Sequence, residues 1–174
     1  MRTDTATLTG DRVAEHGIVA TRLGELTIVR AGEQLTGVYF PHHWHRPDPA
    51  TFGPRTGRGF DEVGRQLNEY LAGERTEFGL PLAPGGSGFQ LRVWELIAEV
   101  PYGRTTTYGE LARRVGGGMT PQEAGAAVGA NPLSILIPCH RVIGSTGKLT
   151  GYAGGLARKR ELLDLERGQL TGPA

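Results

Sequence analysis

The single cysteine of the chain lies in the stretch Ile135-Leu136-Ile137-Pro138-Cys139-His140-Arg141-Val142-Ile143-Gly144. A thiol ionises near neutral pH when a base lies beside it, and the base in turn needs a third group to orient it. His140 follows the cysteine directly, and Glu166 lies in a predicted helix downstream. These three residue types predict an activated thiolate. The alternative is a buried, inert cysteine that packs as a small apolar side chain.

The composition is that of a folded globular protein. The chain has 174 residues, of which 38% are hydrophobic, 21% charged and 7% aromatic, and its formal net charge is +1. These values are ordinary for soluble domains. One cysteine cannot form an internal disulfide, which favours a reducing compartment, and no apolar run approaches the roughly 18 residues that span a bilayer. We therefore expect a cytoplasmic monomer with no membrane partner.

The first half of the chain predicts a small sheet followed by a helix. Apolar runs separated by turn residues indicate three antiparallel strands, at residues 18–21, 26–29 and 35–40. Residues 41–59 are rich in proline and glycine and predict a loop. Apolar residues then recur at helical spacing from 60 to 71, and Gly73 stands where a left-handed residue would end the helix. We expect an N-terminal lobe over residues 1–84.

The second half predicts a helical lobe over residues 85–174. Residues 81–88, rich in Pro and Gly, are its predicted link to the first lobe. Three helix starts are marked by Ser or Thr with Gln or Glu three residues later, a pattern in which side chains cap the free backbone groups. These pairs are Ser87 with Gln90, Thr107 with Glu110, and Thr120 with Glu123. The last two helices, joined by the glycines 116–118, resemble a helix-turn-helix.

The second helix of that pair carries almost no side-chain bulk, because Gly125, Ala126 and most of their neighbours are small. A helix that reads bases in the major groove needs longer side chains. Two explanations stay open. The helix packs tightly against another helix, or it approaches the narrow minor groove of double-stranded DNA.

Taken together, these segments resemble the O6-alkylguanine-DNA alkyltransferases, also called methylated-DNA–protein-cysteine methyltransferases. The Pro-Cys-His-Arg-Val signature of that family is present at residues 138–142 without a substitution. Further matching segments follow in the same order along the chain, at Phe89-Gln90, Val93-Trp94, Pro101-Tyr102-Gly103, residues 107–112, Asn131-Pro132 and residues 147–156. The resemblance covers roughly residues 18–166.

The resemblance implies an α+β fold. Its first part is a ribonuclease-H-like small antiparallel sheet with a helix, and its second is a helical, winged-helix-like helix-turn-helix domain with the active site. The implied function is DNA repair by stoichiometric transfer of an alkyl group to the protein's own cysteine, without a cofactor. The implied partner is double-stranded DNA containing O6-alkylguanine, with O4-alkylthymine as a further candidate. The damaged base must leave the stack, at a cost of roughly a few kcal/mol.

Four catalytic roles follow from the resemblance. Cys139 is the nucleophile, His140 is the general base that acts on the thiol through a water, and Glu166 orients the imidazole. Asn131 holds the turn around the nucleophile by hydrogen bonds. We expect Glu166 in the last turn of its helix, where the helix dipole disfavours a carboxylate unless it is paired. A solvated glutamate at a helix end is the alternative.

Other residues are implied to contact the substrate or DNA. The hydroxyl of Tyr108 donates to the flipped base, and an interfacial core tyrosine is the alternative. Backbone carbonyls of Cys139 and Val142 accept from the exocyclic amine of guanine. Arg141 is expected to pair between the lobes. The remaining residues expected at substrate or DNA are Gly125, Ala126 and Ser145.

Two positions depart from the family pattern. Gln122 stands where the family has the arginine that fills the space left by the extruded base. Glutamine is uncharged and shorter, so we expect weaker and more salt-tolerant DNA binding. Ala153 stands where many relatives have serine, so a hydroxyl contact to the O6 atom is missing, although a backbone amide can replace it.

Three other interpretations of the chain are a metal site, a lesion-binding protein and a cysteine hydrolase. The run Pro41-His42-His43-Trp44-His45 suggests a metal, but zinc usually takes four ligands and this segment has no cysteine, so we expect exposed histidines and no metal. A non-transferring protein of the alkyltransferase-like type would bind the lesion without reacting, but such proteins replace the cysteine. A cysteine hydrolase using Cys139, His140 and Glu166 would need an oxyanion hole and turnover.

Overall fold

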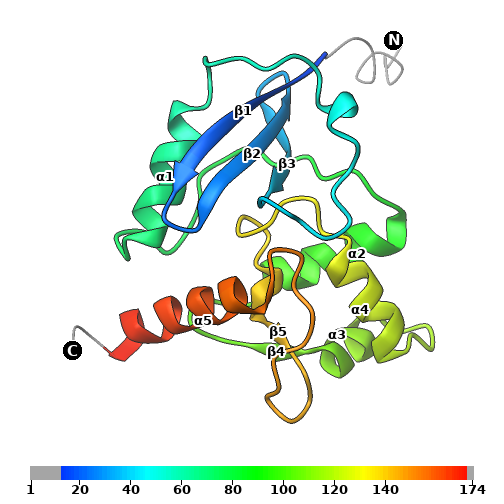
Figure 1. The fold of residues 1–174 in the computed structure, drawn as a ribbon. Coiled ribbons are helices and arrows are strands. Elements are labelled where there is room, and N and C mark those ends of the chain that lie inside the picture. Colours follow the sequence, from blue (N-terminus) through cyan, green and yellow to red (C-terminus); the bar gives the residue numbers. More distant parts are fainter. Residues whose placement is uncertain (1–12, 172–174) are drawn as a thin grey trace, which may run out of the picture.

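Three antiparallel strands begin the fold. β1 (Ala14–Thr21) pairs with β2 (Gly24–Ala31), and β2 pairs with β3 (Gln34–Tyr39). The computed structural model describes residues 13–171, and Figure 1 shows this sheet above a mainly helical part. The predicted three-stranded sheet is confirmed. β1 begins earlier than predicted because residues 14–17 pair in register with residues 28–31.

The loop at residues 41–59 covers the free edge of β1. His16 of β1 donates its backbone N–H to the Pro54 carbonyl at 3.0 Å and accepts from the Thr56 N–H at 2.9 Å. A short 3-10 helix, η1 (Pro49–Phe52), capped by Asp48, holds the loop in shape. An uncovered edge strand offers unpaired backbone groups to other chains, so this loop protects the sheet.

The opposite edge, on β3, is completed by segments from later in the chain. Leu35 exchanges backbone hydrogen bonds with Pro81 and Ala83, both at 2.8 Å. Val38 donates its N–H to the Pro132 carbonyl at 2.8 Å. The predicted linker at residues 81–88 is therefore partly bound to the sheet, and the turn before the cysteine segment extends the same edge.

Helix α1 (Asp61–Leu71) packs beside the sheet. Gly17 of β1 lets the Phe60 ring, just before the helix, approach closely, since a Cβ on Gly17 would lie 2.4 Å from that ring. The helix ends as predicted, with Gly73 at φ 78°.

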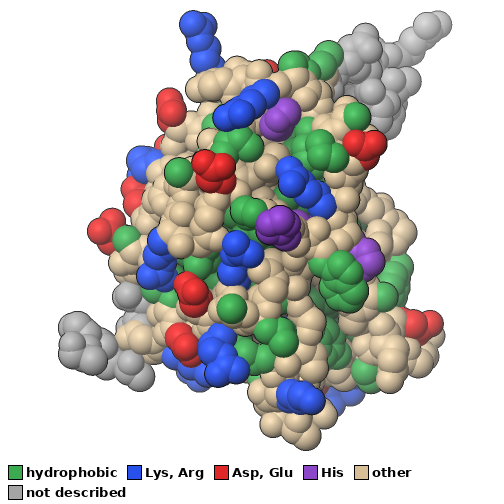
Figure 2. All heavy atoms as spheres, viewed as in Figure 1, with side chains coloured by type: hydrophobic (Ala, Val, Ile, Leu, Met, Phe, Trp, Pro, Cys, Tyr) green, Lys and Arg blue, Asp and Glu red, His purple; other side chains and the backbone are tan. Residues whose placement is uncertain are grey.

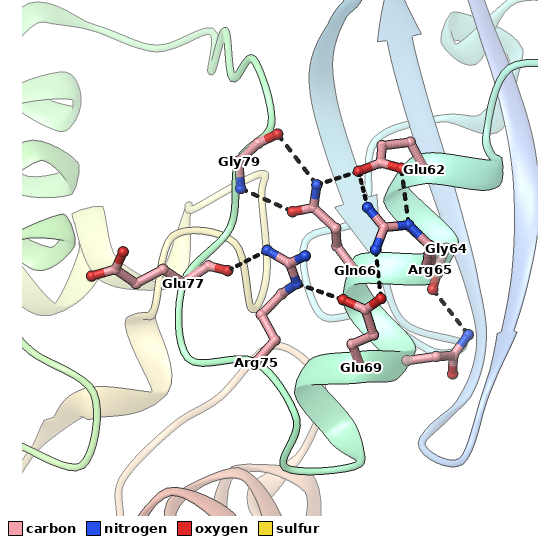
Figure 3. A network of polar contacts seen from close by, with 9 residues as sticks. Glu62, Gly64, Arg65, Gln66, Glu69, Arg75, Glu77 and Gly79 are labelled. Atoms are coloured by element: carbon pink, nitrogen blue, oxygen red, sulfur yellow. Dashed lines mark hydrogen bonds and ion pairs between the residues drawn. The ribbon is translucent and has the colours of Figure 1, made fainter.

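The chain after α1 is fixed by polar side chains of the helix (Figure 3). Gln66 is only 3% exposed and exchanges hydrogen bonds with the backbone of Gly79, at 2.9 and 3.3 Å. Glu69 accepts from both Arg65 and Arg75, and Arg75 also donates to the Glu77 carbonyl. These contacts hold α1 in one position relative to the segment that leads into the second half.

The helical part contains α2 (Gly88–Ala98), α3 (Tyr108–Val115), α4 (Pro121–Gly129) and α5 (Leu156–Thr171), with short parallel strands β4 (Thr106–Thr107) and β5 (Val142–Ile143). Ser87 and Thr120 form reciprocal capping boxes with Gln90 and Glu123. At α3 the Thr107 hydroxyl accepts from the Glu110 N–H, but the Glu110 side chain pairs with Arg113 instead.

The prediction that Glu166 lies in the last turn of its helix is wrong. α5 continues to Thr171, and Gly168 lies within it. A glycine inside a helix costs only about 1 kcal/mol relative to alanine, which the surrounding turns can tolerate. The dipole argument therefore does not apply to Glu166, and side-chain contacts explain its position instead.

One apolar core joins the two halves of the described chain. It includes fully buried residues of the sheet and α1, among them Leu26, Ile28 and Leu67, and of the later helices, among them Leu96, Leu111 and Leu162. The type of secondary structure changes near residue 84, but the apolar core continues from one half into the other. No helix within residues 13–171 is long and apolar enough to cross a membrane.

Candidate active site

The cysteine lies in a short 3-10 helix, η2 (Cys139–Arg141), which follows a tightly bound turn. Asn131, 3% exposed, donates from Nδ2 to the Ile137 carbonyl at 2.9 Å and accepts the Leu133 N–H at 2.9 Å. Ile135 within the turn has φ 71°, which is unfavourable for a β-branched residue. The hydrogen bonds expected of Asn131 are present, and they fix the backbone that carries the nucleophile.

The Cys139 side chain is buried and its thiol is favoured over the thiolate. Cys139 is only 5% exposed, and burial raises the pKa of the thiol because an apolar environment disfavours the charged form. A hydrogen bond with the Asn131 side chain and the nearby Lys159 ammonium act in the opposite direction. The resting thiol therefore needs a base to react.

His140 contributes an imidazole that can accept a proton. Its Nε2 lies 2.9 Å from Oε1 of Glu166, and the carboxylate oxygen can only accept, so Nε2 carries the proton. Nδ1 is buried and has no partner among the described residues, so its lone pair is available for a proton. Burial lowers the pKa of His140, and Glu166 offsets part of that effect. The ring is held in its neutral form with a fixed tautomer.

Glu166 is the centre of the polar network. Oε1 accepts from the Tyr70 hydroxyl at 2.6 Å, and Arg141 donates to both carboxylate oxygens at 2.8 to 3.1 Å. The Gly103 N–H adds a contact at 3.3 Å. Burial alone would raise the pKa of this carboxyl, but the hydrogen bonds from His140, Arg141 and Tyr70 outweigh it and hold the pKa at about 2. Glu166 is thus a permanent carboxylate.

The link between the lobes differs from the one predicted. Arg141 pairs with Glu166 and with the Val100 carbonyl at 2.7 Å, both in the second half of the chain. Tyr70, from α1, is the residue that reaches across to the carboxylate. Sequence reasoning assigned Tyr70 only to the apolar stripe of its helix. A buried tyrosine hydroxyl needs a partner, and that requirement was the available signal.

Lys159 is a second functional candidate that the sequence reasoning missed. It is fully buried, and its Nζ donates to the Thr150 carbonyl at 2.7 Å and lies 5.9 Å from the centre of the Tyr108 ring. Burial lowers the pKa of Lys159 to about 8, against the attraction of Cys139. Lys159 precedes Glu166 by seven residues, so both lie on one face of α5, and this spacing could have revealed it.

A cavity of about 370 Å³ lies above the cysteine. Cys139 and Asn131 contribute to its lining, together with Tyr108 of α3 and Gln122 of α4. The other wall is formed by residues 150–153 and by Trp44. The Tyr108 hydroxyl donates to the Thr150 carbonyl at 3.3 Å across the opening. The arrangement places a thiol at a largely apolar cavity, with an imidazole and a carboxylate in hydrogen-bond contact buried beneath it.

Comparison with known proteins identifies this arrangement. The family model described as "6-O-methylguanine DNA methyltransferase, ribonuclease-like domain" matches residues 15–84, and the model for the "DNA binding domain" of the same methyltransferase matches residues 88–168. The chain belongs to the 6-O-methylguanine DNA methyltransferase family.

Individual members of the family agree with this assignment. A methylated-DNA–protein-cysteine methyltransferase of Mycobacterium bovis is 44% identical over 145 residues, which cover 83% of this chain and 87% of that protein. One from Methanosarcina acetivorans is 51% identical over 107 residues, 62% of this chain and 69% of that protein. The crystal structure of Mycobacterium tuberculosis OGT in complex with DNA matches with a TM-score of 0.83 and 41% identity, covering 89% of this chain and 94% of that one.

Most residues expected from the family resemblance meet at the cavity, but several do not. Tyr108, Gln122, Gly125 and Ala153 line it, as do Asn131 and Cys139, while His140 and Glu166 lie buried beneath. Three others lie outside the cavity lining. Val142 is buried in β5, Ser145 is exposed in the turn after β5, and Ala126 is exposed on the outer face of α4 beside Phe89. Ser145 was expected to contact the substrate or DNA, and its exposed position leaves a contact with DNA as a prediction.

The histidine segment also differs from expectation at one residue. His42 and His45 are exposed, but His43 is only 7% exposed, and its Nδ1 accepts the Phe40 N–H at 3.2 Å. Burial lowers the pKa of His43 to about 4. Within residues 13–171 no group of three or more His, Cys, Asp or Glu side chains is placed to hold a metal ion.

Proposed function

We propose that this chain repairs DNA by transferring an alkyl group from the O6 atom of guanine to Cys139, once per molecule. The observation that carries the proposal is the cysteine at the floor of the cavity with a neutral histidine and a permanent carboxylate directly behind it. Family membership agrees with a methyltransferase that acts on DNA.

The transfer begins with the removal of the thiol proton. Nδ1 of His140 accepts that proton through a water, and the resulting imidazolium is stabilised by Glu166 at 2.9 Å. Lys159 and the Asn131 amide favour the thiolate in a site that otherwise disfavours charge. The network therefore supplies a base for the thiol proton and a positive charge that favours the thiolate.

The thiolate then attacks the alkyl carbon in line with the bond to O6. The new S–C bond forms as the C–O6 bond breaks, and the bonding electrons stay with guanine. Tyr108 at the cavity wall donates to the departing base, and the proton that left the thiol restores neutral guanine. The product on the protein is a thioether, which water does not hydrolyse. Each molecule of the protein therefore acts once.

The damaged nucleotide reaches the thiol only if it leaves the DNA stack. α4 presents Gln122 at the rim of the cavity and has little bulk, which suits close approach to the minor groove. On the face drawn in Figure 2, basic and acidic side chains are interspersed. With glutamine at the rim and mixed charges on this face, we propose that a monomer binds DNA with modest dependence on salt.

The test is to incubate the protein with duplex DNA that contains one O6-methylguanine and to weigh it. Transfer predicts a mass gain of about one methylene located on Cys139, and a Cys139→Ala variant binds the duplex without gaining mass. Binding of the wild type without mass change would instead support a lesion-binding protein. Neither binding nor transfer, with hydrolysis of thioesters or esters, would support a cysteine hydrolase.

A further inference from the structure

Trp44 is a large apolar side chain that is exposed at the mouth of the cavity. It is 60% exposed, and among the described residues it is the one cavity-lining residue from the first half of the chain. A single exposed aromatic residue is unremarkable by itself. Its position in the lining of the cavity that also contains Cys139 is the informative feature, because this cavity must hold a base and its substituent.

The segment that carries Trp44 is held in a fixed and strained shape. Trp44 donates its backbone N–H to the Ala153 carbonyl at 2.8 Å, and its ring stacks on His45 with centroids 4.6 Å apart. His42 and His45 on either side have φ of 57° and 60°, a left-handed conformation that is uncommon for residues other than glycine, although histidine adopts it more often than most. Such strain persists only where the surroundings enforce it, and it is often found at functional sites.

Contacts from the sheet and the preceding strand enforce this shape. The buried His43 accepts the Phe40 N–H through Nδ1 and donates its own N–H to the Phe40 carbonyl. Arg46 donates its N–H to the His43 carbonyl, and its guanidinium reaches Thr27 of β2 at 3.1 Å. The indole is therefore pre-positioned, so a group that packs on it loses little entropy in ordering the protein.

The geometry of the reaction determines which part of the substrate can contact the Trp44 indole. In-line displacement places the sulfur, the alkyl carbon and O6 on one line, so the rest of the alkyl group must project sideways toward a wall. The guanine ring lies against the wall formed by α3 and α4, because Tyr108 and Gln122, which are proposed to contact the flipped nucleotide, line that wall. The other wall consists of residues 150–153 and Trp44, and Ala153 offers a methyl group and no hydroxyl.

We propose that Trp44 forms the outer wall of the subsite for the alkyl group and selects for planar aromatic or long apolar substituents on O6. This inference rests on the proposed function. The indole face packs against the substituent, and the methyl group of Ala153 adjoins the indole in the same wall. A methyl group is too small to reach the indole, whereas a benzyl group can stack on it.

The test compares single-turnover rate constants on two duplexes that differ only in carrying O6-methylguanine or O6-benzylguanine. We expect Trp44→Ala to lower the ratio of benzyl to methyl rate constants about tenfold, while Trp44→Phe, which keeps an aromatic face, lowers it less than threefold. Leu156→Ala is the matched control, since Leu156 is also exposed, at 48%, but does not line this cavity, and the ratio should not change.

Each other outcome overturns the inference. An unchanged ratio for Trp44→Ala, including equal losses on both substrates, would mean that the indole contacts DNA or the base. A ratio that rises would mean that the indole excludes large groups. Failure of the wild-type protein to react with O6-methylguanine would contradict the proposed function itself, so the two failures are distinguishable. Circular dichroism of both Trp44 variants verifies that they are folded.

Discussion

Removing the hydroxyl of Tyr70 should lower the free energy of unfolding, because Glu166 loses one hydrogen-bond donor. Tyr70→Phe deletes a donor that lies 2.6 Å from Oε1 of the carboxylate and leaves the ring contacts with Phe78 and Tyr102 in place. A hydrogen bond to a charged group contributes about 1.5–3 kcal/mol, and Glu166 keeps its bonds from His140 and Arg141, so we expect a loss of about 2 kcal/mol. For a chain of this size, that lowers Tm by about 4–8 °C.

The stability lost in Tyr70→Phe should decrease as the pH is lowered. The folded-state pKa of Glu166, about 2, is depressed below its ordinary value of 4.5, so its stabilisation is complete above pH 4.5 and is lost as the pH falls toward 2. The hydroxyl is one cause of that depression. The difference in stability between wild type and Tyr70→Phe should therefore be largest near neutral pH and narrow as the solution is acidified through this window.

The assay is urea unfolding followed by circular dichroism at about pH 7 and at about pH 3. The lower pH lies between the folded-state pKa of Glu166 and its ordinary value, where the stabilisation is being lost. Tyr102→Phe is the matched control, because the Tyr102 hydroxyl is buried near the same network but has no hydrogen-bond partner among the described residues. That control should cost nothing at either pH. Equal stability of Tyr70→Phe and wild type near neutral pH, or a difference that does not shrink in acid, would refute the reasoning.

Three further changes test other parts of the site. Gln122→Arg should raise the transfer rate on duplex DNA and steepen the salt dependence of binding by about one phosphate contact; unchanged salt titrations would show that this position does not face DNA. Lys159→Met keeps the buried stem but removes the charge near the thiol, so the rate at neutral pH should fall and the rate–pH curve should move to higher pH; a curve that stays in place would count against an electrostatic role. Asn131→Ala leaves the Ile137 carbonyl and the Leu133 N–H without their partner and should cost about 2–4 kcal/mol in urea unfolding, a loss that an unaltered midpoint would contradict.

Local chemistry explains which parts of the fold could be predicted. The strands follow from apolar runs between turn residues, and the starts of α2 and α4 follow from capping pairs only three residues apart, Ser87 with Gln90 and Thr120 with Glu123. The end of α1 follows from Gly73. In each case the decisive contact lies within one turn of the backbone, so a short stretch of sequence contains it.

The parts that could not be predicted depend on contacts between distant residues. Tyr70 and Glu166 are 96 positions apart, and the pattern around Tyr70 does not distinguish a partner of this carboxylate from a core residue. The family resemblance implied that Cys139, His140 and Glu166 act together, but it did not imply that Arg141 binds the same carboxylate. Ser145 lies exposed in the turn after β5 and outside the cavity lining, so its expected contact with DNA stays a prediction.

The edge of β3 has a consequence for how the protein is made. Its Leu35 bonds to residues near 82, and its Val38 bonds to Pro132, so the first strands leave the ribosome long before the segments that complete them. During synthesis the backbone groups on the edge of β3 lack these hydrogen-bond partners, and unpaired strand edges favour association with other chains. The polypeptide that finally covers it is the same turn that delivers the cysteine. The sheet edge and the backbone that presents the sulfur are thus completed by one and the same contact, between Val38 and Pro132.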